Sequence, residues 1–509
     1  MKKIYLALTV AAASLISSCD MDLAPVGSLD DGNAIESVTD LMKARNGIYE
    51  NLRSIATGGY VFYTDIQMDQ FMGLTINGNQ NGQFAHGNIN SSISDIEGVW
   101  ANCYSYIANA NYLLGHADHV TANPDLDSDD LLEAKRYVAE TRFARAYYYY
   151  YLFDHFCETY SPALGDVAAK GLPLVTVFNP TGDIAAYPGR STMNETFKLI
   201  DDDLAAAYTD LKAYETETSY AVAPMAAYVN SYTVLALQAR LALLRQDWKT
   251  AVAKANEVIN SGIYTLADVD SYAAMWAQDA SDELIFRPIS TRTERGISST
   301  GGAYIDGNPE MAYYVPTLGG ALTTYVNGDV RFDAFFGIRS LRANGITYPA
   351  YVFNKYPGNT ELNSGSNNDL MNMGKPFRLS ETYLILAEAA CEDGDLSTAG
   401  KALNDIRAAR IAGYEEEIFS NADILRQQIR EERTKELIGE GFRMSDLRRW
   451  NLGFKRDATY VQGSSLPEIF VTVDTQVEYT AGDYRYVWPI PNTEMENNPQ
   501  LKGQQNPGY

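Results

Sequence analysis

Two stretches of this chain share one pattern, and that pattern decides the predicted fold. Residues 239–251 read ARLALLRQDWKTA, and residues 387–399 read AEAACEDGDLSTA. The two stretches align without a gap, and Asn256 and Asn404 then coincide. Each reads as a helix, a short turn and a second helix, with small alanines where two helices must approach closely. The pattern therefore predicts two helical hairpins.

The spacing within each hairpin resembles a tetratricopeptide repeat. A hairpin of this kind cannot bury its apolar face alone, so several must stack. Apolar residues at three- and four-residue steps predict further helices before and after the repeat. These helices are residues 99–114, residues 131–156, residues 195–211 followed by 225–244, and residues 424–450.

Two long stretches between the helices do not read as helix. Residues 57–95 are rich in Gly, Asn and Gln, and residues 265–375 are aromatic and punctuated by glycine. Loops of such length in a compact chain are usually functional or disordered. Their many aromatic residues argue against disorder. We therefore expect these stretches to carry the function.

The N-terminus has the order of a secretory signal. Lys2 and Lys3 precede an apolar run over residues 4–16, and Ser17-Ser18-Cys19 follows. The run is too short to span a bilayer, which takes about 20 apolar residues. Because this end resembles a lipobox, residues 1–18 are predicted to be a lipoprotein signal peptide and Cys19 the lipid attachment site. The alternative is an ordinary signal peptide cleaved elsewhere.

The composition narrows the possible partners. A net charge of −25 and a pI near 4.6 argue against nucleic acid and anionic membrane surfaces. After processing, Cys103, Cys157 and Cys391 remain, so one disulfide at most can form, and whether Cys103 and Cys157 pair stays open. With 36 Tyr, 18 Phe and 5 Trp, the chain has ample aromatic side chains for ligand contacts.

The chain resembles the SusD/RagB family of starch-utilisation outer-membrane lipoproteins. The signs are spread over nearly all of the mature sequence. They are Trp100 with IANAN at 107–111, RAYYY at 145–149, RLSETYL at 378–384, Glu432-Arg433 with Glu440-Gly-Phe-Arg443 and DLRRW at 446–450, PIP at 489–491, and Asn506-Pro507.

The resemblance implies a mainly α fold in a single domain, residues 19–509. A scaffold of about four tetratricopeptide-like hairpins would carry long irregular ligand-binding insertions. Residues 19–260 would hold most helical pairs, and residues 261–509 the loop 265–375 and the last pairs. The implied location is the outer membrane at the cell surface through the lipid anchor, without enzymatic activity. The implied partner is a SusC-like, TonB-dependent barrel transporter, over whose mouth the lipoprotein sits.

We therefore expect capture of an oligo- or polysaccharide and its delivery to that transporter. Besides a purely structural outer-membrane component, two alternatives stay open. One is capture of peptide or another non-sugar nutrient, which the RagB branch of the family suggests. The other is a surface glycoside hydrolase, because such enzymes need only two carboxylates about 5 to 9.5 Å apart, and a single sequence with 65 acidic residues does not exclude such a pair.

Sugar recognition needs flat aromatic faces and polar side chains that satisfy buried hydroxyl groups. Trp100 follows the polar stretch 77–95 and matches a position from which several family members offer a stacking tryptophan; packing at the helix start is the equal alternative. Asn102 lies near it in sequence. Asp65, Gln67 and Asp69 share one side of the chain if that segment is extended, and a solvated edge is their alternative.

The second irregular stretch supplies further stacking candidates, although most tyrosines in so tyrosine-rich a chain must be structural. We expect one or two of five to contact ligand. The five are Trp276, Tyr304, Tyr313, Tyr314 and Tyr325.

No catalytic or metal motif is evident. The sequence has no G-x-S-x-G, H-E-x-x-H, phosphate loop or metal-spaced cysteine set. Glu432, Glu436 and Glu440 stand at four-residue steps near Arg433 and Arg443, a spacing that suits ion pairs on one helix. We interpret them, with Arg378 and Glu381, as a structural ion-pair lattice.

We predict no cofactor. His116 and His119 could suggest a metal site, and residues 125–129 could suggest calcium. The latter stretch lacks the glycine and distal glutamate of an EF-hand. We therefore expect loop and helix-cap roles for both, and calcium binding is left open.

Overall fold

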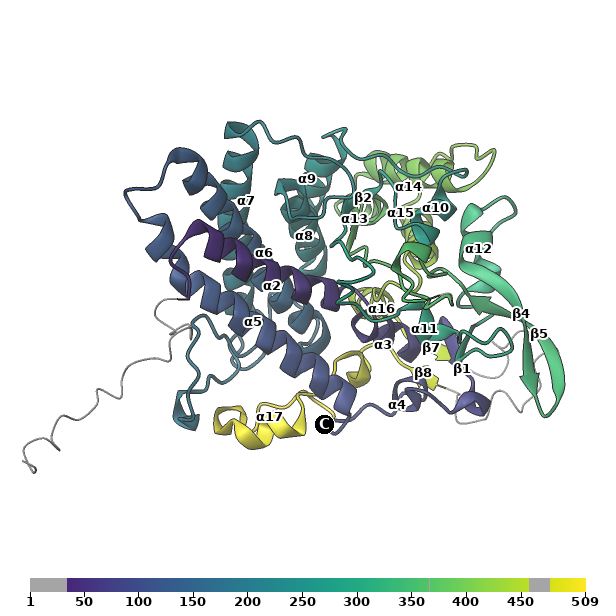
Figure 1. Ribbon diagram of the computed structural model, residues 1–509. Coiled ribbons are helices and arrows are strands. Elements are labelled where there is room, and N and C mark those ends of the chain that lie inside the picture. The colour runs from purple at the N-terminus through teal and green to yellow at the C-terminus, as the bar shows by residue number, and fades with distance from the viewer. Residues whose placement is uncertain (1–33, 366, 457–476) are drawn as a thin grey trace, which may run out of the picture.

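Figure 1 shows the computed structural model, which describes residues 34–365, 367–456 and 477–509. The predicted signal peptide, residues 1–18, and Cys19 lie outside the described residues. Long helices gather on the left and top of the view, and short strands with irregular segments lie on the right. The fold is mainly α, as predicted.

The longer helices described are α2 (Val38–Ile55), α3 (Gly59–Gln67), α5 (Ser94–Thr121), α6 (Ser128–Phe156), α7 (Met193–Glu217), α8 (Ser231–Leu244), α9 (Trp248–Ile259), α13 (Leu379–Glu392), α14 (Leu396–Arg410) and α15 (Ala422–Glu436). The shorter ones are α4 (Gly82–Ala85), α10 (Tyr272–Ala277), α11 (Gly301–Tyr304), α12 (Val330–Phe335), α16 (Arg443–Arg449) and α17 (Asn492–Asn497). The strands are β1 (Phe71–Gly73), β2 (Leu284–Phe286), β3 (Tyr314–Pro316), β4 (Phe336–Ala343), β5 (Ile346–Phe353), β6 (Phe377–Arg378), β7 (Phe454–Arg456) and β8 (Val477–Tyr479).

The two hairpins predicted from the repeat are confirmed as α8–α9 and α13–α14. Asp247 and Asp395, which align in the repeat, each accept a hydrogen bond that caps the second helix of their hairpin. Alanines from both hairpins fill a shared buried core that also includes Leu425 and Ile429 of α15. The close approach of the hairpins therefore depends on small side chains at matching positions.

The N-terminal helices extend beyond their predicted bounds. The predicted helix 99–114 is part of α5, and Asp127 caps α6, whose predicted start was 131. Helix α7 is also longer than predicted, whereas α8 begins at Ser231 rather than at 225. The ion pair of Arg145 with Asp203, at 2.7 Å, joins α6 to α7 within the core.

Two predicted segments differ from the structure. Residues 57–95 contain helix α3, so the stretch is not irregular throughout. The single helix predicted over 424–450 is two helices, α15 and α16. Gly439 and Gly441 interrupt it with φ values of 76° and 83°, a left-handed conformation that suits glycine.

Within the described ranges, four small antiparallel sheets pair β1 with β3, β2 with β6, β4 with β5, and β7 with β8. In the first of them Phe71 faces Pro316 and Gly73 faces Tyr314. This pairing joins the first irregular stretch to the second. The two stretches that we expected to carry function therefore form one continuous region.

Candidate ligand-binding site

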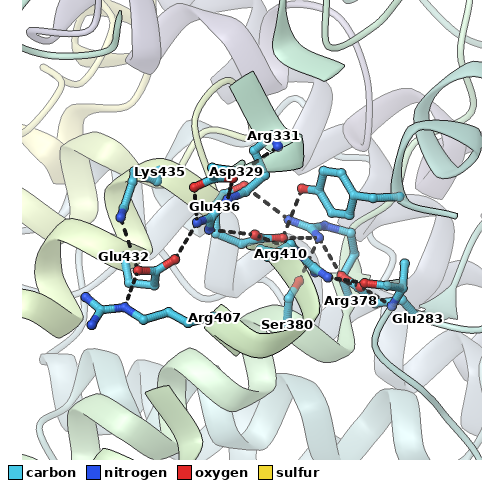
Figure 2. Close-up of polar contacts among 12 residues, drawn as sticks. Glu283, Asp329, Arg331, Arg378, Ser380, Arg407, Arg410, Glu432, Lys435 and Glu436 are labelled. Carbon is cyan, nitrogen blue, oxygen red and sulfur yellow. Dashed lines mark hydrogen bonds and ion pairs between the residues drawn. The ribbon is translucent and has the colours of Figure 1, made fainter. Parts of the chain in front are cut away.

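Glu432 and Glu436 of α15 lie within a buried ion-pair network (Figure 2). Glu436 contacts Arg331 at 3.1 Å, Arg378 at 3.0 Å and Arg410 at 3.0 Å. Burial alone would raise the pKa of Glu436, but Arg410, Arg378 and Arg331 together hold that pKa well below its usual value. Burial would likewise raise the pKa of Glu432, but the cations around it lower that pKa to about 2.

These carboxylates therefore stay ionised at neutral pH and do not suit proton transfer. The prediction of a structural ion-pair lattice is confirmed, with one difference. The arginines come mainly from other elements rather than from the same helix: Arg378 also contacts Glu440 and Glu283, and Arg433 of α15 pairs with Asp446 of α16 at 2.8 Å.

The predicted polar candidates Asp65 and Gln67 lie in helix α3 and are buried. Asp65 accepts a hydrogen bond from the Gly441 N–H at 2.8 Å, and its burial raises its pKa to about 7. Gln67 accepts a hydrogen bond from the Trp488 indole at 3.0 Å and donates to the Tyr479 hydroxyl at 3.1 Å. Both side chains therefore join the N-terminal part to the C-terminal part and offer nothing to a ligand.

Asp69 forms a two-point ion pair with Arg443, at 2.8 and 2.6 Å. The pair lies in a groove of about 790 Å³ along α15 that Arg426 and Trp450 also line. Arg426 is itself paired with Glu392 at 2.7 Å. The polar groups of Asp69 and Arg443 thus satisfy each other.

Most predicted stacking residues are core residues. Trp100 is 3% exposed, and its ring lies against Tyr104 and Phe156, so the packing interpretation applies. Tyr304 and Tyr314 are also buried, at 0% and 1% exposure. None of these three rings has a face open to a sugar.

Trp276 is also buried, at 1% exposure, with three cations near its ring. The closest is the Lys355 ammonium, 4.3 Å from the ring centroid, and Lys375 and Arg378 lie at 5.1 and 5.2 Å. Tyr325 is half-buried, and its hydroxyl donates to the Lys435 carbonyl at 3.1 Å. The rings of Trp276 and Tyr325 therefore contact the ionic core and do not serve as stacking faces for a ligand.

Two predicted residues reach the surface. Asn102 is exposed on α5, and Tyr313 is half-buried next to strand β3. The Tyr313 hydroxyl donates to Asp306, a bond that lowers the pKa of Asp306 and raises that of Tyr313. The Gln80 side chain lies near the Tyr313 hydroxyl and opposes the rise of its pKa, so Tyr313 adjoins the loop that precedes α4.

Exposed amides lie on that loop, on α4 and just after α4. We use the name amide surface for the exposed side chains of Asn79, Gln80, Gln83 and Asn88 together with the ring edge of Tyr313. Primary amides both donate and accept hydrogen bonds, and they can match vicinal hydroxyl groups. Asn79 has a φ of 49°, a left-handed conformation that asparagine tolerates better than most residues.

The loop is fixed to an aromatic floor. Tyr314 donates a hydrogen bond to the Gln80 carbonyl, and the Asn77 amide donates to the Ala312 carbonyl at 2.6 Å. Beneath it the rings of Phe84 and Tyr63 are stacked, with centroids 4.7 Å apart and planes 7° from parallel. The amide surface is therefore a rigid platform rather than a free loop.

Arg456 anchors the same region from below. Its buried guanidinium donates to the carbonyls of Ile66, Met68 and Phe71 at 3.0, 2.6 and 2.6 Å, and also to that of Ala85. Burial without a carboxylate in direct contact lowers its pKa to about 10. One side chain therefore holds the ends of α3, β1 and α4 together.

Sequence reasoning did not find Arg456, Phe84 or Tyr63. Their partners are distant in sequence or are backbone carbonyls, which no motif encodes. Only the amide-rich composition of residues 77–90 was a usable signal for this surface.

Within residues 34–365, 367–456 and 477–509, no group of three or more His, Cys, Asp or Glu side chains could hold a metal ion. Asp127 caps α6, as expected, whereas His116 and His119 lie within helix α5 rather than in a loop or at a cap. Cys103, Cys157 and Cys391 are free and buried, which answers the question of their pairing. Among the described residues, no helix combines the length and apolar character needed to cross a bilayer.

The fold and the amide surface together define a class: a helical-hairpin scaffold whose irregular insertions form a polar surface. Two family models match this chain, one described as the SusD family over residues 340–509, and one described as starch-binding associating with outer membrane over residues 27–240. The chain belongs to the SusD/RagB family.

Solved structures and a curated relative agree with this assignment. A SusD superfamily protein from Bacteroides thetaiotaomicron is 25% identical, with a TM-score of 0.74 over 92% of this chain and 100% of that one. A SusD-like carbohydrate binding protein from Bacteroides vulgatus is 18% identical, with a TM-score of 0.70 over 92% and 98%. SusD-like protein P25 from Formosa agariphila is 23% identical over 457 residues, which are 81% of this chain and 78% of that protein.

Proposed function

We propose that this chain is a cell-surface lipoprotein that captures an oligo- or polysaccharide and passes it to a SusC-like, TonB-dependent outer-membrane transporter. Family membership supports the class of function, and the name of the Bacteroides vulgatus relative supports carbohydrate as the cargo. The acylated residue would be Cys19, and the acyl chains would hold the domain at the outer membrane without a spanning helix.

The observation that carries the proposal is the rigid amide surface. Binding a sugar removes its hydroxyl groups from water, and each must find a partner to avoid a cost of about 1–3 kcal/mol. The exposed amides of Gln80, Gln83 and Asn88 supply such partners, as does the Asn79 amide, whose oxygen also contacts the His86 ring at 2.9 Å. The Tyr313 ring supplies an adjoining aromatic edge. Because the floor already fixes the loop, little ordering entropy is lost on binding.

The carboxyl groups favour binding without hydrolysis. A glycoside hydrolase needs a general acid with a raised pKa that reaches the sugar. Among the described residues, burial raises the pKa of Asp65 and Glu140 to about 7, and both are fully enclosed. Burial also raises the pKa of the half-buried Asp210, which lies on α7 and is not part of the amide surface. Asp306, beside the amide surface, has a lowered pKa because of its hydrogen bond from Tyr313.

Affinity electrophoresis of the purified protein in gels that contain starch, fructan, plant, fungal or host-mucin polysaccharides tests the proposal. We expect retardation by one class of glycan that is unaltered after incubation. Tyr313→Ala and Gln80→Ala should each weaken the retardation, whereas Tyr220→Ala, a change at a tyrosine that is 46% exposed elsewhere, should not. Binding of peptides with no glycan retained would favour the alternative cargo, and shortened glycan would favour a hydrolase.

The transporter step needs a separate test. A SusC-like barrel should co-purify with the lipidated protein from detergent-solubilised outer membranes, and Cys19→Ser should remove the protein from the membrane fraction. Recovery of the Cys19→Ser protein in the membrane fraction would contradict the anchor.

A further inference from the structure

A second groove lies on α2, away from the amide surface. Its volume is about 600 Å³, and it runs between one face of α2 and residues 289–296. Asn46, Glu50 and Arg53 line it at successive turns of α2, and Tyr228 lines it from the segment before α8. The two sites share no residue, and the volume is in the range of small-ligand sites, about 300–1,000 Å³.

Tyr228 is an exposed ring in a fixed position. It is 44% exposed, although tyrosines elsewhere in this chain are mostly core residues. The Arg45 guanidinium lies 4.5 Å from its centroid, and the Tyr49 ring packs edge-on at 5.2 Å. The neighbouring Val229 N–H donates to the Tyr49 hydroxyl at 2.8 Å, which holds the backbone. The ring therefore keeps a defined orientation at the groove without a ligand.

Arg53 has no partner of its own. Within the described part of the chain its guanidinium makes no hydrogen bond or ion pair, and its Nε is enclosed and unsatisfied. Gly296, with a φ of 49°, lies flat against it, and a Cβ there would stand only 3.2 Å from Arg53 Nε. An enclosed donor without an acceptor costs about 1–3 kcal/mol. The enclosed Nε is out of reach of a ligand, but the terminal nitrogens of the guanidinium are donors that a ligand oxygen could satisfy.

The charges at the groove balance. Arg53, Arg295, Glu50 and Glu294 all line the groove, and Arg295 is paired with Asp369 at 2.9 Å. Such a balance favours neither an anion nor a cation. The groove instead offers mixed hydrogen-bonding groups. The Arg53 guanidinium only donates, the carboxylates of Glu50 and Glu294 only accept, and the Asn46 amide does both. This mixture matches the donors and acceptors of a polyhydroxyl ligand.

We propose that this groove is a second carbohydrate contact site, in which a pyranose ring of a neutral glycan stacks on Tyr228 and its hydroxyl oxygens accept from Arg53. The inference rests on the proposed function, since it takes the ligand to be a carbohydrate. Its geometry is independent of the amide surface.

The test uses the neutral polysaccharide that retards the purified full chain most strongly. In gels of graded polysaccharide concentration, Tyr228→Ala should raise the apparent dissociation constant about tenfold, in line with loss of one aromatic contact. Arg53→Met, which keeps the stem and removes the donors, should raise it about fivefold. Tyr220→Ala, a matched loss of an exposed tyrosine ring, should leave it within about twofold. Equal melting temperatures of the variants show that folding is unchanged.

The outcomes separate the two proposals. If the unaltered chain is retarded but Tyr228→Ala and Arg53→Met behave like Tyr220→Ala, the second site is wrong and carbohydrate capture stands. If no neutral polysaccharide retards the unaltered chain, the second site is wrong and the proposed function loses its main support as well. Weakening by both groove variants, with Tyr220→Ala unaffected, supports the second site.

Discussion

The rings of Tyr63 and Phe84 are stacked beneath the amide surface, with centroids 4.7 Å apart and planes 7° from parallel. Tyr63 comes from α3 and Phe84 from α4, so the stack joins a scaffold helix to the polar loop. The Tyr63 hydroxyl also donates to Asp95 at 2.8 Å, at the start of α5. The position of the amides thus depends on three helices.

Phe84→Ala should remove one half of this stack. Phe84 is 0% exposed, and large-to-small changes of buried Phe cost about 3–5 kcal/mol. We expect that loss in urea unfolding, together with faster amide hydrogen exchange over residues 78–90. A loss below about 1 kcal/mol, with unchanged exchange, would show that the loop does not depend on its floor.

Arg456→Met should leave four carbonyls without their donor. The cost should be about 3 kcal/mol or more, because several buried acceptors become unsatisfied together. Arg456→Lys should recover part of it, since an ammonium can serve three of the four acceptors. Equilibrium unfolding of both variants measures the difference, and equal stabilities of the two would contradict the role of the guanidinium fork.

Glu436→Gln should destabilise the protein by about 3–5 kcal/mol, because Arg331, Arg378 and Arg410 lose their shared counter-charge in the interior. The matched control is Asp202→Asn, which breaks the exposed pair with Lys198 and should change stability by less than about 0.5 kcal/mol. Urea titrations of the two variants give the comparison. Similar losses in both would mean that the buried network does not stabilise the fold.

Stability should rise as the pH falls from 7 to 5. Burial raises the folded pKa of Asp65 and of Glu140 to about 7, above their unfolded values near 4. Each group therefore contributes stability that is present below the unfolded pKa and is lost as pH rises through about 7. The slope is at most about 1.4 kcal/mol per pH unit for each group. Asp65→Asn should flatten the profile measured by urea unfolding, and an unchanged profile would refute the raised pKa.

The helical scaffold could be predicted because its signals are local. Apolar and alanine spacing predicts the hairpins α8–α9 and α13–α14, and apolar spacing predicts most of α6. Helix α3 was missed because alternation of polar and apolar residues around Asp65 suggested an extended segment. The side chains of Asp65 and Gln67 are buried against Gly441 and Trp488, which lie 376 and 421 positions further along the chain. Local sequence patterns do not encode such distant contacts.

The ligand surface could be predicted only in outline. Composition predicts the polar loop, but Tyr304, a predicted stacking residue, is a core residue, and Trp100 packs in the core as its alternative interpretation held. In a tyrosine-rich chain, aromatic identity does not separate the exposed Tyr228 from the buried Tyr314; only packing does. Asn344-Gly345 between alternating residues was a usable hairpin signal for β4–β5 that the sequence analysis did not use.

Sugar capture without hydrolysis is decided by calorimetric titration of the purified protein with a short oligosaccharide from the retained polysaccharide, followed by analysis of the sugar. We expect saturable binding, an unaltered sugar, and binding that is strongly weakened by Tyr313→Ala but not by Tyr220→Ala. Absence of binding to every glycan offered, or shortening of the sugar during the titration, would contradict it.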